Sequence, residues 1–194
     1  PKVKNKRINP QILDYLYPGC GFGGSCFPKD IKALINFGKK KENEMKILES
    51  VIELNSNQPK IIIRDLSQVI NLNSQNIMIL GLSFKPDTDD IRESPALIIV
   101  RELLKKNNRV FLHDPIAIDN FKNEIGFSTK ITYSNNWEDD IHNSSIIIIL
   151  TKWKEYEKLN SKDLNGKIIY DARRLLKKEN ISCKKYMSIG LSVL

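Results

Sequence analysis

The chain has 194 residues, of which 41% are hydrophobic and 28% charged, and its formal net charge at pH 7 is +8. That apolar content supports a buried core and excludes disorder throughout, while nine glycines and eight prolines exclude a collagen-like chain. Apolar runs such as Ile146–Leu150 are far shorter than the roughly 20 residues that span a bilayer. No secretory signal opens the chain, so we expect a cytoplasmic globular protein with no membrane partner.

The excess of basic residues favours an anionic partner, either nucleic acid or a small molecule that bears phosphate. These residues are spread along the chain, and their short clusters carry no interleaved aromatic residues, so we expect no nucleic-acid partner. Three cysteines without zinc-ligand spacing argue against a disulfide framework and favour a reducing compartment. The chain begins at Pro1 rather than at methionine, which indicates a fragment or a trimmed product.

The first 73 residues are typical of a glycine-rich loop followed by helices. After Pro28 the apolar side chains recur at helical spacing as far as Gly38, which we expect to end that helix. A second helix is expected from Asn43, and Pro59 inside it predicts a kink or a break. Because this amphipathic element has no obvious partner sequence nearby, we interpret it as a spacer or an oligomer contact.

From residue 74 onward the chain alternates short β-branched runs with helical stretches. The expected strands are Ile77–Leu80, Val110–His113, Ile131–Tyr133, Ile146–Leu150 and Ile168–Tyr170. Ser94 as a cap and Pro95 at the first position predict a helix that runs to about Lys106. Nearly continuous apolar strands favour a parallel sheet covered on both faces. We therefore predict an α/β chain in which a helical segment precedes a doubly wound, Rossmann-like domain.

The glycine-rich loop contains a literal G-x-G-x-x-G pattern at Gly19, Gly21 and Gly24. In a dinucleotide-binding fold this pattern follows a strand, and an acidic residue stands about 20 positions later. Here Pro18 occupies the place where the strand should enter, and no such acidic residue follows. We therefore do not interpret this loop as a dinucleotide-binding fingerprint.

Cys26 is the chemically distinctive residue of the same loop, because it stands just before an expected helix N-terminus. The exposed N–H groups and the dipole of that helix end favour a thiolate, and Lys29 adds a nearby positive charge. An inert, buried cysteine remains the alternative from local chemistry alone. Cys20 and Cys183 lack these surroundings, and we expect them to be packing or surface thiols.

Two further loops leave the ends of expected strands, where open α/β sheets bind ligands. The first contains Lys85 and Arg92, which suit phosphate groups. Its aspartates lack the spacing and the closing glutamate of a calcium loop, so we expect no metal site. The second contains Arg173, whose planar fork suits phosphate or a base edge. Solvated surface charges are the alternative for both loops.

Taken in chain order, these segments resemble the nucleotide-sugar dehydrogenases, the UDP-glucose/GDP-mannose dehydrogenase family. GFGGSCFPKD at Gly21–Asp30 matches the family's active-cysteine motif along its whole length. Other segments resemble family motifs in order and spacing: Leu80–Ala96, Asp114-Pro115, Ile146–Trp153 and Tyr170–Leu175.

The resemblance covers nearly all of the chain and implies two parts of a longer enzyme. Residues 1–73 would carry the active cysteine and a central helical region that forms a homodimer. Residues 74–194 would form a Rossmann-like domain that binds the nucleotide sugar. An N-terminal domain that binds most of the NAD cofactor would be absent, so this chain alone would be inactive.

The resemblance also implies a reaction, in which the C6 alcohol of UDP-glucose is oxidised to a carboxylate in two NAD-dependent steps. Cys26 would attack the aldehyde formed first and would carry the product of the second oxidation as a thioester, which water hydrolyses. Asp30 would help to activate that water, and Lys29 would supply positive charge. The contacts carried over from the family are, for the nucleotide sugar, Phe22, Gly23, Phe84, Lys85 and Arg173, and for the cofactor, Arg92.

The residues that follow the cysteine, Phe27–Asp30, favour the UDP-glucose branch of the family. A GDP-mannose substrate is one alternative, and a non-catalytic module for nucleotide-sugar binding or dimerisation is another. One departure concerns a family arginine, in an Arg-Ile pair, that reaches the substrate of the neighbouring subunit. Here Arg7-Ile8 lies three residues too far from Cys26, and Pro10 occupies the matching offset. Either a local insertion restores Arg7 to that role or the contact between subunits is altered.

Overall fold

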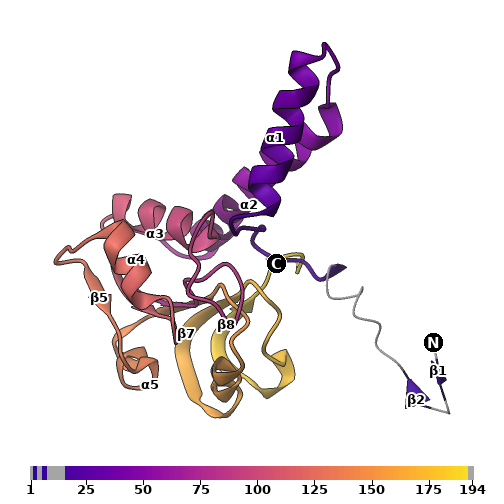
Figure 1. Cartoon of the computed structure of the whole chain (residues 1–194). Coiled ribbons are helices and arrows are strands. Elements are labelled where there is room, and N and C mark those ends of the chain that lie inside the picture. The colour runs from indigo at the N-terminus through magenta and orange to yellow at the C-terminus, as the bar shows by residue number, and fades with distance from the viewer. Residues whose placement is uncertain (1, 4–5, 8–15, 192–194) are drawn as a thin grey trace.

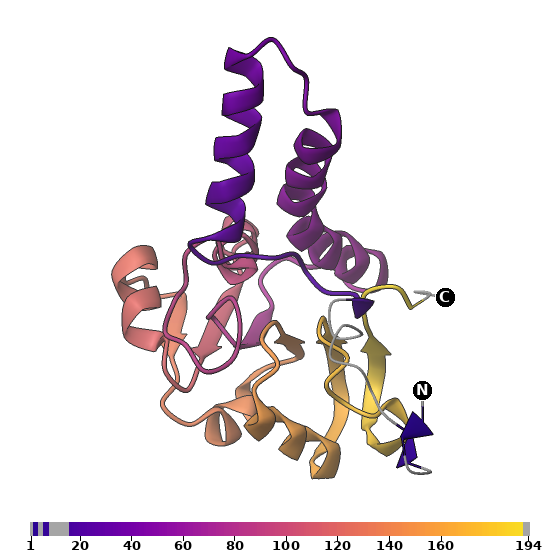
Figure 2. The same cartoon turned by 45° about the vertical axis from the view of Figure 1, so that its right-hand side comes forward.

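The computed structural model describes residues 2–3, 6–7 and 16–191. Helices α1 (Phe27–Lys40) and α2 (Lys46–Val69) form a pair, the helical arm, that projects from an α/β unit (Figure 1). Figure 2 shows the arm joined to that unit at its base, with the turn between the helices at its far end. Two short strands near the N-terminus, β1 (Lys2–Val3) and β2 (Lys6–Arg7), pair antiparallel.

Helix α1 begins where the glycine-rich loop ends. The Asp30 N–H donates to the Cys26 carbonyl over 2.8 Å. The first turn of the helix tolerates Pro28, because N–H groups there have no partner within the helix and the missing N–H of proline costs nothing. The prediction that Gly38 ends the helix was wrong, since α1 continues to Lys40. Gly38 is instead buried where the chain turns back, and a Cβ added to it would lie 2.8 Å from the Asn43 carbonyl oxygen.

Helix α2 starts three residues later than expected, at Lys46 rather than Asn43, and runs unbroken through Pro59. The predicted break at this proline was therefore wrong. Because proline has no N–H, it cannot bond the Asn55 carbonyl one turn earlier. That carbonyl faces the glycine-rich loop, where it would lie 3.4 Å from a Cβ added to Gly21.

The α/β unit is built on a six-stranded parallel sheet whose order is β5-β4-β3-β6-β7-β8. Its strands are β3 (Asn76–Leu80), β4 (Arg109–His113), β5 (Ile131–Tyr133), β6 (Ile146–Ile149), β7 (Asp163–Asp171) and β8 (Ser182–Met187). The order reverses between β3 and β6, as in a dinucleotide-binding sheet, which confirms the predicted doubly wound fold. Two segments were missed: β8, and the first part of β7 before Ile168.

Helices cover both faces of this sheet. They are α3 (Pro95–Lys105), α4 (Ile118–Ile125), α5 (Trp137–Asp140) and the 3-10 helices η2 (Ile141–Asn143), η3 (Lys154–Ser161) and η4 (Lys178–Asn180). Ser94 caps α3 as expected, accepting a hydrogen bond from the Ala96 N–H. None of the described helices is long and apolar enough to cross a bilayer.

Alternate residues of the isoleucine strand β6 enter two separate cores. Ile146 and Ile148 pack with α2 and α3, whereas Ile147 and Ile149 pack with residues of α5 and η3. This alternation explains why the strand is apolar at every position, since each face of the sheet is buried. The C-terminal half of α2 belongs to the first core through Ile62, Ile63 and Leu66, so the arm is anchored in the α/β unit.

Candidate functional site

A cavity of about 310 Å³ lies at the carboxyl edge of the sheet, where the strand order reverses. The loops after β3, β6 and β7 line this basic cavity together with the segment before the cysteine, through Tyr17, Pro18, Phe84, Lys85, Pro86, Thr151, Lys152 and Arg173. Three of these side chains are cationic and none is acidic. The Lys85 ammonium lies 5.5 Å from the centre of the Phe84 ring, and the Lys152 ammonium lies 5.7 Å from that of Tyr17. Cations beside aromatic faces suit a ligand that combines phosphate with a planar base.

Arg173 is held in the basic cavity by the loop after the neighbouring strand. Its Nε donates to the Leu150 carbonyl over 2.6 Å, and its own N–H donates to Asp171 over 3.0 Å. A Cβ added to Gly19 would lie 2.7 Å from its Nη1, so the glycine leaves room for the guanidinium. With Nε engaged, the other guanidinium N–H groups are free of that anchor and can bind an anion bidentately.

Asp114, the residue after β4, ties the loops around the basic cavity to one another. It is buried, and its carboxylate accepts hydrogen bonds from Leu82, Ser83, Ile116, Ala117 and the Trp153 indole. Leu82 and Ser83 precede Phe84, Trp153 follows Lys152, and the other two residues follow β4, so one carboxylate joins the segments after three strands. Buried networks of this kind are rigid when every polar atom has a partner.

The cysteine loop, residues 19–26, packs against the loop that follows β3. The Gly24 N–H donates to the Arg92 carbonyl over 2.8 Å. A Cβ added to Gly23 would lie 2.9 Å from the Glu93 carbonyl carbon and 3.0 Å from the Phe84 Cβ, and one added to Gly24 would lie 2.8 Å from the Phe84 ring. Within residues 16–26 no strand enters this loop, so its glycines serve close packing rather than a strand-to-helix fingerprint.

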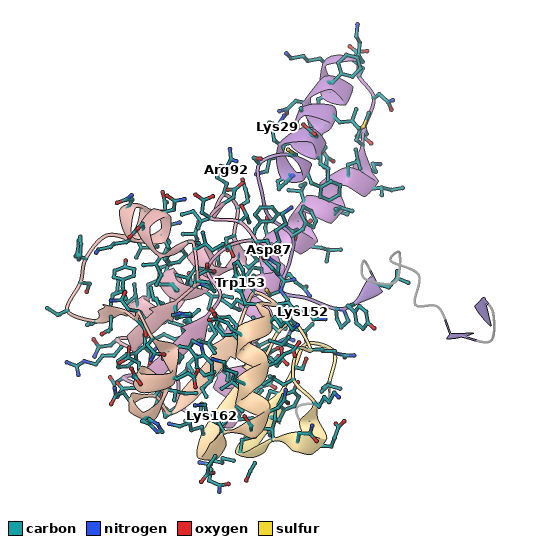
Figure 3. The ribbon with its side chains drawn as sticks, turned by 60° about the horizontal axis from the view of Figure 1, so that its bottom comes forward. Lys29, Asp87, Arg92, Lys152, Trp153 and Lys162 are labelled. Atoms are coloured by element: carbon teal, nitrogen blue, oxygen red, sulfur yellow. The ribbon has the colours of Figure 1, made fainter. Side chains whose placement is uncertain are left out.

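Cys26 is exposed at the end of this loop, and its Sγ lies 3.6 Å from the Ser25 hydroxyl. Two cations interact with it electrostatically, Lys29 from the first turn of α1 and Arg92 from the loop after β3. A cleft of about 680 Å³ contains Ser25, Lys29 and Arg92 among its lining residues. Figure 3 shows Lys29 and Arg92 at the base of the arm, with Lys152 and Trp153 farther toward the sheet.

Each of these cations has an acidic partner nearby. Lys29 lies 2.8 Å from Asp30, and the hydrogen bond between them raises the pKa of the lysine. The Arg92 guanidinium donates to both oxygens of Asp90 over 2.9 and 2.8 Å, which lowers the pKa of the aspartate and raises that of the arginine. Asp90 is thereby paired with an arginine, and the Asp89 carboxylate accepts a hydrogen bond from Asn120.

The structure thus places the predicted residues in two groups. Phe84, Lys85 and Arg173 line the basic cavity, whereas Lys29 and Arg92 line the cleft beside Cys26, with Asp30 paired to Lys29. Phe22 and Gly23 line neither space and lie in the loop between them. Ile8 and Pro10 lie outside the described residues, as does the side chain of Arg7.

Sequence reasoning missed three residues that the structure brings to this region. Tyr17 and Lys152 line the basic cavity, and Asn55 of α2 bonds the backbone of the cysteine loop. Lys152 had a detectable signal, because it follows a buried strand at the carboxyl edge of the sheet. Trp153 and Tyr156 nearby are buried and pack in the second core.

Alkylation should distinguish the three thiols. We expect iodoacetamide to modify Cys26 at least about tenfold faster than Cys183, because burial raises the pKa of the Cys183 thiol and limits access to it. Cys20 is fully buried, which raises the pKa of its thiol, and it should react only on unfolding. Mass spectrometry of timed samples measures the rates, and the Cys26→Ser variant should lose the fast phase. Equal rates for Cys26 and Cys183 would contradict this expectation.

Comparisons with known proteins show the family of this chain. Residues 78–178 match the UDP binding domain of the UDP-glucose/GDP-mannose dehydrogenase family, and residues 3–57 match its central domain. The chain is 37% identical over 190 residues to a UDP-glucose 6-dehydrogenase of Rickettsia conorii. The matched region covers 93% of this chain but only 43% of that protein.

Two solved structures are similar as well. A UDP-glucose dehydrogenase from Pyrobaculum islandicum superposes with a TM-score of 0.79 at 34% identity, covering 90% of this chain and 39% of that one. A GDP-mannose dehydrogenase from Pseudomonas aeruginosa superposes with a TM-score of 0.73 at 26% identity, covering 91% and 41%. The chain therefore spans about two fifths of the length of these relatives. With a family domain matched over more than half of its residues, the chain belongs to the UDP-glucose/GDP-mannose dehydrogenase family.

Proposed function

We propose that this chain is the nucleotide-sugar-binding and active-cysteine part of an NAD-dependent UDP-glucose 6-dehydrogenase. The observation that carries the proposal is the basic cavity, where three cations and two aromatic rings meet at the carboxyl edge of the sheet. Phe84 and Tyr17 offer surfaces for a base, and Lys85, Lys152 and Arg173 offer charges for a diphosphate. The similarity to UDP-glucose dehydrogenases over most of the chain supports uridine as the base.

Cys26 is the nucleophile in this proposal. Its thiolate attacks C6 of the sugar aldehyde, so that a C–S bond forms and the carbonyl oxygen takes a proton. Oxidation of that adduct leaves a thioester, and attack by water breaks the C–S bond, releasing the carboxylate and restoring the thiol. Cys26 is exposed, so a substrate can reach it, and the positive charges of Lys29 and Arg92 can stabilise the oxyanions formed during these steps.

Asp30 is the proposed acceptor of a proton from the hydrolytic water. It stands one turn into α1 after Cys26, and the Lys29 ammonium lies 2.8 Å from its carboxylate. An ionised carboxylate in that position can act as a general base once its bond to lysine is shared with water.

The cleft beside Cys26 fits part of a dinucleotide cofactor. Lys29, Lys32 and Arg92 line it and would hold the cofactor's diphosphate, in exchange for their present acidic partners Asp30, Glu93 and Asp90. Bound NAD would accept the hydride removed from C6 at each oxidation. Most contacts to NAD would come from a domain outside this chain, in keeping with the share of its relatives that the chain covers.

Titration calorimetry of the chain tests the proposed ligand. We expect UDP-glucose and UDP to bind with similar affinity and GDP-mannose to bind at least about tenfold more weakly, which is 1.4 kcal/mol. Tighter binding of GDP-mannose would favour the alternative substrate. Binding of UDP-glucose together with ordinary reactivity of Cys26 would favour a non-catalytic binding module.

We also propose that the helical arm forms the contact of a homodimer. Its surface exposes large apolar side chains, among them Phe37 at 59% exposure, Leu54 at 69% and Ile47 at 81%. Contiguous apolar surface of this kind marks an interaction site in proteins of this size.

Lysine substitutions on the apolar surface of the helical arm test the proposed dimer. The double substitution Phe37→Lys and Leu54→Lys should convert a dimer to a monomer, because it places two charges within an apolar contact. Sedimentation velocity measures the mass, and Phe127→Lys is the control, since Phe127 is 81% exposed but lies after α4, away from the arm. A dimer that survives the double substitution would contradict the proposed contact.

A further inference from the structure

Two amide side chains of α2 bond the backbone of the cysteine loop. The Phe22 N–H donates to Asn55 Oδ1 over 2.8 Å, and Asn55 Nδ2 donates to the Phe22 carbonyl over 3.0 Å. One turn along the helix, Gln58 Nε2 donates to the Gly19 carbonyl over 3.1 Å. Because residues three apart lie on the same helix face, both amides meet the same stretch of loop.

The local sequence on both sides permits this contact. A Cβ added to Gly21 would lie 3.0 Å from Asn55 Oδ1, so a larger residue at position 21 would press on the amide. Asn55 satisfies both polar groups of Phe22, which would otherwise need water or a strand partner. Beyond Phe22 the loop is fixed by the segment after β3, where the Gly24 N–H donates to the Arg92 carbonyl.

These bonds lie between the two chemically active parts of the site. Pro18 lines the basic cavity, and Cys26 stands at the other end of the loop. The residues between them include four glycines, which allow the chain many conformations. The length of the loop alone would therefore leave the separation between the basic cavity and the thiol undefined.

We propose that Asn55, supported by Gln58, is a positioning residue that fixes the distance between the bound nucleotide and the Cys26 thiol. The inference rests on the proposed function, because it assumes a ligand whose sugar extends from the diphosphate toward Cys26. Asn55 touches neither the reacting atoms nor the basic cavity, and acts through the backbone of Phe22. Displacing a reacting group by about 1 Å can reduce the rate about a hundredfold, so a fixed loop matters for the thiol.

The test compares UDP with UDP-glucose as ligands that protect Cys26 from iodoacetamide. In the unsubstituted chain, at ligand concentrations ten times each measured Kd, we expect UDP-glucose to slow alkylation about tenfold and UDP no more than about twofold. The reason is that only the sugar reaches the thiol. In Asn55→Ala, the Kd for UDP should stay within about twofold, whereas the protection that requires glucose should fall below about threefold.

Two further variants separate positioning from a general loss of stability. Gln58→Ala removes a single bond to the loop and should give an intermediate loss of glucose protection; it decides the matter if Asn55→Ala does not fold. Asn57→Ala is the matched control, because Asn57 is exposed on the same helix and its side chain accepts a hydrogen bond from Lys60 of that helix. It should protect like the unsubstituted chain.

The outcomes distinguish this inference from the proposed function. Full glucose protection in Asn55→Ala and Gln58→Ala would overturn the inference alone. A parallel loss of UDP and UDP-glucose binding would also overturn it, because a positioning residue of the loop should spare the nucleotide. Failure of the unsubstituted chain to bind either ligand would overturn the proposed function, and the inference with it.

Discussion

Replacement of Gly81 by alanine is expected to lower the free energy of unfolding by about 3 kcal/mol or more, from added backbone strain and overpacking. Gly81 follows β3 directly and has a φ of +94°, in the left-handed region that L side chains rarely adopt. Its N–H donates to the His113 carbonyl over 2.9 Å, which fixes the backbone in that conformation. A Cβ at this position would lie 2.5 Å from the Thr151 nitrogen and 2.7 Å from its hydroxyl oxygen.

The clash would reach the basic cavity as well as the core. The buried Thr151 hydroxyl donates to the Ser83 carbonyl over 2.6 Å, which joins the loops after β3 and β6. An alanine at position 81 must push these loops apart, so that UDP affinity should fall together with stability.

A matched glycine separates the two causes of that loss. Gly166 has a φ of +82°, but a Cβ added to it would meet nothing within 4 Å. Gly166→Ala should therefore cost only the strain of the left-handed conformation, about 1–2 kcal/mol. Urea denaturation followed by circular dichroism measures both variants. Equal losses for the two would show that the contact with Thr151 contributes nothing.

The strands that could be predicted from the sequence are those whose two faces are both buried. Ile146–Ile149 is apolar at every position because one core lies on each side, and the pattern is visible without knowledge of the neighbours. Strand β8 occupies the edge of the sheet, and its sequence SCKKYM carries two lysines. Edge strands are often polar, because charges there oppose pairing with other chains, and so the apolar signal is lost. The start of β7 was missed because its pairing with β8 is irregular there. The register shifts between Leu164 and Ile168, and the residues before Ile168 are mostly polar.

The residues of the candidate site also divide into those that the sequence could predict and those that it could not. Arg173 and Lys85 could be found because they follow strands whose carboxyl ends meet at one edge. Asn55 could not, because its partner Phe22 is 33 residues away and the pairing depends on how α2 packs. Of the kink or break predicted at Pro59, the break did not occur, since a buried proline inside a helix that packs against the rest of the fold need not end it. Local sequence thus identifies chemistry at strand ends but not the side chains that hold a loop from outside.

Removing the Arg173 side chain should cause the largest loss of nucleotide affinity. We expect Arg173→Ala to raise the Kd for UDP about thirtyfold, equivalent to about 2 kcal/mol, because hydrogen bonds to charged groups contribute roughly that much. Arg173→Lys keeps the charge, but an ammonium cannot bond the Leu150 carbonyl and hold a phosphate with the same fork geometry. Its Kd should therefore rise about tenfold.

Arg174 is the control for Arg173, because it is the adjacent arginine and its side chain bonds a backbone carbonyl elsewhere. Its guanidinium donates to the Ile189 carbonyl over 3.0 Å, and it does not line the basic cavity. Arg174→Ala should change the Kd for UDP by less than about twofold, as measured by calorimetry at two salt concentrations. If the two alanine variants weakened UDP binding equally, and if this loss relative to the unsubstituted chain disappeared at high salt, Arg173 would act only through net charge. A loss confined to Arg173 and retained at high salt requires direct contact with the diphosphate, because buried or paired charges are screened far less than exposed ones.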